Sequence, residues 1–168
     1  AATVTTLVAS TSITDSGLTS GRVTYAGTAG LLQDSANLLY SGTDLTVYGV
    51  TVGRGGGAVS TNTAVGASAL QANTTGNYNS AFGNLALYTN ITGQYNTAIG
   101  QGSLYLNTGS LNTAVGVSSL QNNSTGASNT AQGYQALFSN TTASNNTAVG
   151  YQAGYTNQTG TRNTFIGE

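Results

Sequence analysis

The sequence predicts an all-β protein in which an N-terminal module of short strands is followed by a repetitive parallel β-roll or β-solenoid. A 17-residue motif recurs from residue 62 to the end of the chain. Each copy carries two regular glycine positions, which suit chain bends, and between them lie β-suited triplets such as residues 63–65. A unit this short cannot hold two helices, but it suits one coil of a solenoid that rises by about 4.8 Å.

The first sixty residues do not share this period. Short strands are expected at residues 22–25, 38–40 and 44–48, with turns at 29–30 and 41–43. The segment 54–61 contains Arg-Gly-Gly-Gly and is interpreted as a flexible joint. The sequence therefore predicts three parts, a short-strand β module at 1–53, a Gly-rich joint at 54–61 and a shaft of about six coils at 62–168.

The consensus of the repeat is Asn-Thr-Ala-Val-Gly-x-x-Ala-Leu-x-x-Asn-x-Thr-Gly-x-x, and its positions are numbered 1 to 17 below. One copy is a residue shorter than the others and lacks that residue between Asn107 and Gly109. A change in length is tolerated best in a turn, so positions 12 to 15 are expected to form one.

Asparagine occupies positions 1 and 12 in every complete copy. Stacked coils would bring identical side chains above one another, where they can hydrogen-bond side chain to side chain as structural ladders. The alternatives are that each asparagine caps its own turn or binds a ligand. The first column is Asn62, Asn79, Asn96, Asn112, Asn129, Asn146 and Asn163, and the second is Asn73, Asn90, Asn107, Asn123, Asn140 and Asn157.

Two apolar columns are the candidate core. Burial of one large aliphatic side chain from each column contributes about 3 to 6 kcal/mol per coil, whereas ordering a coil costs about 25 kcal/mol. This comparison predicts that both columns face other copies of the chain around a common axis, with three copies in the assembly. The columns are Leu70, Leu87, Leu104, Leu120 and Leu137 at position 9, and Val65, Ile99, Val115 and Val149 at position 4.

The composition removes most catalytic chemistry. The chain has no His, Cys or Lys, so a serine nucleophile would lack a base and zinc would lack its usual ligands. Asp34 and Asp44 could form a glycan-cleaving pair, but both are better explained as turn formers. No basic surface suits nucleic acid, and no apolar run is long enough to enter a bilayer. We expect no enzyme activity, cofactor or metal.

Aromatic residues recur at three repeat positions. Tyr134 and Tyr151 share position 6, and they could stack on the sugar rings of a host surface glycan. The favoured alternative is that they cover the apolar row of an adjacent protomer. The other aromatic columns are Tyr88, Tyr105, Phe138 and Tyr155 at position 10, and Tyr78 and Tyr95 at position 17.

With the repeats laid out, the chain resembles bacteriophage tail-fibre and other virion appendage proteins. The segment that begins with residues 20–27 and ends with residues 45–47 is similar to a module found upstream of the repeats in such fibres. The Asn-Thr-Ala-Val-Gly-Tyr-Gln-Ala unit at 146–153 is similar to their shaft repeats. The repeats are also similar to the head repeats of trimeric autotransporter adhesins, in which three chains share a left-handed parallel β-roll.

This resemblance implies a homotrimeric, extracellular segment of a virion tail fibre that contacts other tail proteins and supports attachment to a host cell. Two alternatives remain open. One is the head of a trimeric adhesin on a bacterial surface, and the other is an ice-binding β-solenoid that presents the position-2 threonines. The chain stops within a motif at Gly167 and Glu168, so a C-terminal continuation is expected.

Overall fold

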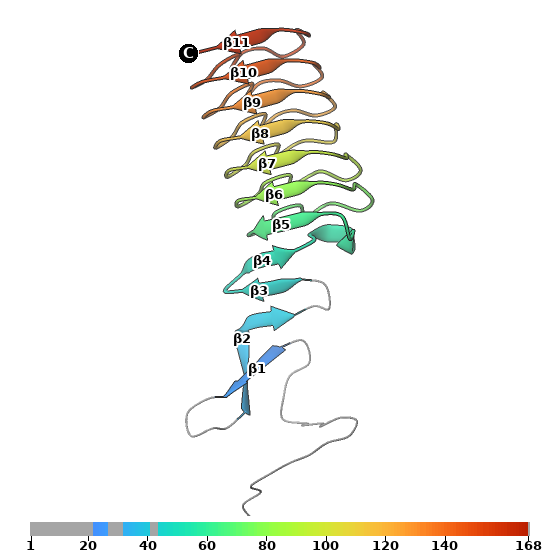
Figure 1. Ribbon diagram of the computed structural model, residues 1–168, viewed down its shortest axis with the longest axis vertical. Coiled ribbons are helices and arrows are strands. Elements are labelled where there is room, and N and C mark those ends of the chain that lie inside the picture. Colours follow the sequence, from blue (N-terminus) through green and yellow to red (C-terminus); the bar gives the residue numbers. More distant parts are fainter. Residues whose placement is uncertain (1–21, 27–31, 41–43, 168) are drawn as a thin grey trace, which may run out of the picture.

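The computed structural model describes residues 22–26, 32–40 and 44–167, and within them the chain forms a long rod (Figure 1). Its described strands make one sheet of 11 strands that follow one another in chain order. The predicted all-β fold with a β-solenoid of 17-residue coils is confirmed. Among the described residues no helix has the length and apolarity needed to cross a membrane.

Antiparallel strands form the base of the rod. They are β1 (Arg22–Ala26), β2 (Leu32–Tyr40), β3 (Leu45–Val47) and β4 (Val50–Gly53). The β3–β4 hairpin turns at Tyr48 and Gly49, which both have positive φ as a type I′ turn requires. The last of these strands, β4, pairs antiparallel with the first repeat strand, so that Val52 lies opposite Val65. The sheet therefore runs from the base into the repeats without a break.

The Gly-rich segment packs closely against the first coil. It contains a short 3₁₀ turn, η2 (Gly56–Ala58), and the Gly56 N–H donates to the Leu70 carbonyl at 3.0 Å. A Cβ on Gly56 would lie 2.3 Å from the Gln71 carbonyl oxygen, and one on Gly57 would lie 2.5 Å from that of Thr74. The glycines are needed for this close approach of two backbones, and the segment covers the end of the first coil.

The repeat strands stack in parallel and in register, with each position opposite the same position of the next coil (Figure 1). Each strand covers repeat positions 2 to 4, and the first extends to position 5. They are β5 (Thr63–Gly66), β6 (Ser80–Phe82), β7 (Thr97–Ile99), β8 (Thr113–Val115), β9 (Thr130–Gln132), β10 (Thr147–Val149) and β11 (Thr164–Ile166).

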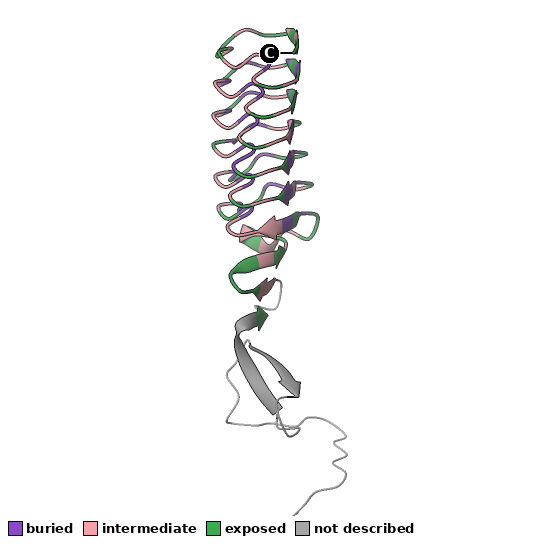
Figure 2. Cartoon of the chain, turned by 90° about the vertical axis from the view of Figure 1, so that its left-hand side faces the viewer, coloured by how far each residue is buried: buried purple, intermediate pink, exposed green. Residues whose placement is uncertain are grey.

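Each chain encloses its own core (Figure 2). The position-9 leucines, Leu70, Leu87, Leu104, Leu120 and Leu137, are all 0% exposed in the single chain. Alanines at position 3 and small residues at position 8 pack beside them. The prediction that this leucine column faces neighbouring copies is therefore wrong. Asparagine side chains fill the rest of the narrow interior, so one leucine per coil closes it.

The position-1 asparagines form the predicted buried ladder, although their bonds run to the backbone rather than from side chain to side chain. In each coil the Oδ1 atom accepts the N–H of the next asparagine in the column, for example from Asn129 to Asn112 at 3.0 Å. The Nδ2 atom donates to the carbonyl at position 15, as Asn112 does to Gly126 at 2.8 Å. Each side chain thus ties two coils together.

The position-12 column carries side-chain bonds from coil to coil. Asn123 donates to the Oδ1 of Asn107 at 2.7 Å, and Asn140 donates to that of Asn123 at 2.6 Å. The same amides donate to the carbonyl at position 15 of their own coil. In the short coil this second bond reaches Gly109, two residues after Asn107, instead of three. The missing residue lies where the other coils bend, as the sequence predicts.

Tight bends place non-glycine residues at positive φ at positions 7, 9 and 17. Such a conformation costs about 1 to 2 kcal/mol for an ordinary side chain but little for asparagine. Leu111 at position 17 has a φ of 63° and is 58% exposed, whereas Asn145 holds the same position with a φ of 61°.

We expect Leu111→Asn to raise the free energy of unfolding by about 0.5 to 1 kcal/mol, because asparagine relieves this backbone strain. Urea unfolding followed by circular dichroism measures the change. Leu106→Asn is the matched control, since Leu106 is 42% exposed and does not have a positive φ. An equal gain in both variants would contradict the strain argument.

Candidate interaction surface

Alternation along each repeat strand decides which side chains reach the surface. Position 3 points into the coil, where Ala64, Ala98 and Ala114 are 0% exposed. Positions 2 and 4 consequently point outward, since successive residues of a strand face opposite sides. The register aligns position 4 of every coil with Val52 and Leu45 of the base hairpin.

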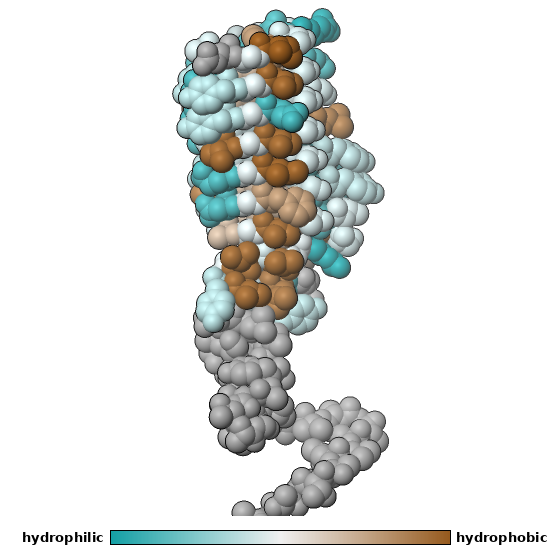
Figure 3. Space-filling view, turned by 60° about the vertical axis from the view of Figure 1, so that its left-hand side comes forward, coloured by the Kyte–Doolittle hydropathy of each residue, from teal (hydrophilic) through white to brown (hydrophobic). Residues whose placement is uncertain are grey.

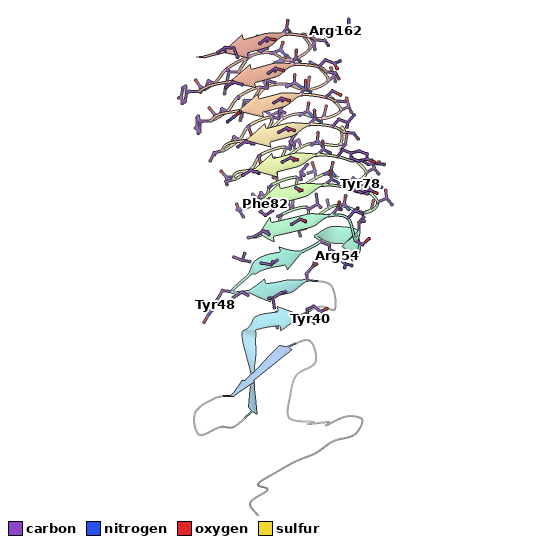
Figure 4. All side chains as sticks on the ribbon, viewed as in Figure 1. Tyr40, Tyr48, Arg54, Tyr78, Phe82 and Arg162 are labelled. Atoms are coloured by element: carbon purple, nitrogen blue, oxygen red, sulfur yellow. The ribbon has the colours of Figure 1, made fainter. Side chains whose placement is uncertain are left out.

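This alignment produces an apolar stripe along the solenoid and the β3–β4 hairpin. Figure 3 shows it as a vertical brown column, and Phe82, one of its members, projects away from the rod in Figure 4. Ile99 is 43% exposed and Ile166 is 73% exposed. The apolar stripe consists of Leu45, Val47, Val50, Val52, Val65, Phe82, Ile99, Val115, Val149 and Ile166.

The two apolar columns that were predicted to share one core therefore lie in different parts of the structure. The leucines lie inside the chain, while Val65, Ile99, Val115 and Val149 lie on its outer face rather than in one core with them. Alanine takes the inward position of the strand because the leucine and asparagine side chains of the opposite wall leave room only for a methyl group. A larger residue at position 3 would collide with that wall wherever leucine holds position 9 of the preceding coil.

One polar residue interrupts the stripe. Gln132 stands at position 4 of its strand, between Val115 on β8 and Val149 on β10. It is exposed, and it shows as the teal break in the brown column of Figure 3. Within the described part of the chain its side-chain amide makes no hydrogen bond.

The stripe carries no charge. Among residues whose side chains the structure describes, the charged ones are Asp44, Arg54 and Arg162, and none belongs to the stripe. Beside the stripe runs the position-2 column of hydroxyl residues, which also points outward. It consists of Thr63, Ser80, Thr97, Thr113, Thr130, Thr147 and Thr164.

Tyr134 and Tyr151 stand at position 6, two residues after the stripe position of their coils. Their rings stack on each other with centroids 5.4 Å apart, and they are 45% and 54% exposed. Because each ring covers one face of the other, a sugar cannot stack between them. Both rings are exposed, and contact with a glycan stays a prediction. Three further stacked pairs are Tyr78 with Tyr95, Tyr88 with Tyr105, and Phe138 with Tyr155.

A polar depression of about 350 Å³ lies at the base of the solenoid, with Asp44, Thr51, Ser68 and Gln71 among its lining residues. The Asp44 Oδ1 accepts the Arg54 backbone N–H at 2.6 Å, which ties the Gly-rich segment to the start of β3. Asp34 lies in β2 opposite Thr24, and its side chain is outside the described part. The described residues contain no group of three or more His, Cys, Asp or Glu that could hold a metal ion.

No family model, curated protein or solved structure matches the chain.

Proposed function

We propose that the chain is a structural shaft segment of a bacteriophage tail fibre or a similar virion appendage, in which three copies pack their apolar stripes around a common axis. The observation that carries this proposal is the uncharged, exposed apolar stripe along a stiff solenoid. The number of copies and the phage setting come from the resemblance of the repeats to fibre and adhesin repeats.

A second copy of the same chain is the partner that fits the stripe best. Full burial of an aliphatic side chain contributes about 1.5 to 3 kcal/mol, and the stripe offers ten apolar side chains that are mostly part-exposed. A parallel copy presents the same side chains at the same spacing, coil for coil. The absence of charge on the stripe removes the repulsion that identical charged surfaces would meet.

Such an assembly has the properties of a spacer. Hydrogen bonds between consecutive coils make each chain stiff along its length, because separating two coils breaks backbone and asparagine bonds together. We assign the segment an extracellular role in the virion, where it connects other tail proteins to the part of the fibre that contacts the host. Host surface glycans remain possible ligands of Tyr134 and Tyr151.

Ile99→Asp tests the interface. We expect the wild-type chain to sediment and scatter light as an assembly of three times 16.8 kDa, and the variant to be monomeric, because three carboxylates would be buried together on the axis. Thr92→Asp is the control, since Thr92 is exposed and lies away from the stripe. A wild-type chain that stays monomeric at micromolar concentration would refute the proposal.

Immunogold electron microscopy tests the setting. Antibodies against the solenoid are expected to label the tail fibres of the phage that encodes it. Labelling of a bacterial surface instead would overturn the virion assignment and favour the alternative of a trimeric surface adhesin.

The outward threonine column favours a second candidate function, ice binding. Regular hydroxyl and methyl groups on a flat sheet are the expected features of such a surface, and the position-2 column runs through β5 to β11. Thermal hysteresis of the purified chain distinguishes the two candidates. A shaft segment is expected to show no thermal hysteresis. A clear hysteresis gap from a monomeric chain would refute the fibre proposal and favour ice binding.

A further inference from the structure

We infer that Gln132 sets the register of the assembly, by forming a polar layer inside the otherwise apolar interface between copies. This inference rests on the proposed packing of copies through the apolar stripe, and it names the residue that would make that packing specific.

The structure gives Gln132 an unusual position. It is exposed on the outer face of β9, its neighbours in the column are Val115 and Val149, and its amide has no hydrogen-bond partner within the described part of the chain. Two nearby glutamines at position 7 behave differently, since Gln152 donates to the Oε1 of Gln135 at 2.8 Å. Gln132 is therefore an amide between two aliphatic neighbours, and it needs a partner once another copy covers the column and excludes water.

Symmetry supplies that partner. Copies related by a rotation axis along the solenoid keep every residue at the same height, so Gln132 of one chain meets Gln132 of the others. An amide carries both donors and an acceptor, and a ring of amides can satisfy itself. The rest of the stripe is aliphatic apart from Phe82. These side chains would pack almost equally well if one copy were displaced by a coil, so they do not fix the register.

If one copy slides by one coil along the axis, the glutamine amides no longer meet and lose these hydrogen bonds. Such a shift would place the amide opposite Val115 or Val149 of a neighbour, where it is buried without a partner. An antiparallel copy that overlaps the whole stripe also leaves the amide without a partner. Because Gln132 lies away from the centre of the stripe, reversing one copy places an apolar residue opposite it. Buried polar residues fix the register of helical coiled coils by the same mechanism.

Disulfide trapping tests the inference, since the chain contains no other cysteine. Val149→Cys, one coil from Gln132, reports whether copies lie in register. With Gln132 present, we expect oxidation to convert most of the protein into covalently linked pairs on a non-reducing gel. With Gln132→Val added, the linked fraction should fall several-fold while light scattering still shows an assembly, because slipped registers become populated. Gln132→Asn should restore part of the linkage, since it keeps the amide.

Gln121→Val is the control, because Gln121 lies outside the stripe and its replacement should leave the linkage unchanged. An undiminished linked fraction in the Gln132→Val background overturns the inference. So does an assembly in which Val149→Cys never links, because the copies are then not in register on this face. A chain that forms no assembly at all refutes the proposed function itself, and light scattering distinguishes that outcome from the other two.

Discussion

Replacing Asn112 by alanine is expected to lower the free energy of unfolding by about 4 kcal/mol, a loss comparable to that of a large core side chain. Asn112 is 0% exposed. Its Oδ1 accepts the Asn129 N–H, and its Nδ2 donates to the Gly126 carbonyl. Alanine leaves the Asn129 N–H buried without a partner, which costs about 1 to 3 kcal/mol. The Gly126 carbonyl loses one of its two amide donors and keeps the bond from Asn123. The cavity left by the missing side chain adds to the loss. Because the interior is closed, water outside the coil cannot take over the hydrogen bonds of the missing amide.

Urea unfolding at a fixed protein concentration measures this loss, because the stability of an assembly depends on concentration. Asn122→Ala is the matched control. Asn122 lies one position before the second asparagine column, is only part-buried, and its side chain makes no hydrogen bond within the described residues. Its replacement should change stability by less than about 0.5 kcal/mol. Equal losses at the two sites would show that the buried ladder contributes little.

The coil could be predicted from the sequence because the spacing of the repeat is a covalent property. Equal spacing places identical residues above one another in any stacked structure, so the buried asparagine column and the bend around Gly109 followed from it. The bonding within the ladder did not follow. Whether Asn112 reaches the side chain or the backbone of the next coil depends on the distance between coils and the depth of the side chain.

The direction of the strand side chains could not be predicted either. In the triplet Thr-Ala-Val, alternation allows the alanine or its two larger neighbours to face inward. Total apolar volume suggested that Val115 and Leu120 share one core, yet Leu120 is buried and Val115 lies on the outer face. The deciding factor is the opposite wall, where leucine and asparagine already fill the space. That wall is known only once the bends are placed.

Two departures from the repeat consensus mark a further contact between coils. The sixth coil has Gly154 where earlier coils have leucine, and the next coil has Phe165 where they have alanine. In the structure these two departures meet. A Cβ on Gly154 would lie 2.7 Å from the Phe165 Cδ2 and 3.0 Å from the Leu137 Cδ2. The phenylalanine ring therefore occupies the space that a leucine of the preceding coil would otherwise fill.

The second large prediction follows from this exchange. Gly154→Leu alone should destabilise the chain by about 3 kcal/mol, because the new side chain collides with the ring of Phe165 in a packed interior. Backbone strain accounts for only about 1 to 2 kcal/mol of this loss, since Gly154 has a φ of 63° and Leu137 holds a φ of 50° at the same position. Phe165→Ala alone should cost about 2 to 3 kcal/mol, less than a fully buried phenylalanine, because Phe165 is only part-buried.

The double variant restores the consensus of the other coils and should recover most of the loss, with a coupling energy of about 2 kcal/mol or more. Gly102→Leu is the control for the glycine replacement. Gly102 has a φ of 65°, but a Cβ there meets no atom closer than 3.8 Å, and Leu85 holds the same position in the preceding coil. That variant should lose only about 1 to 2 kcal/mol, the cost of its backbone strain, because no collision adds to it. Additive losses in the double variant would mean that the two sites do not share one space, and that each coil tolerates core substitutions independently of its neighbour.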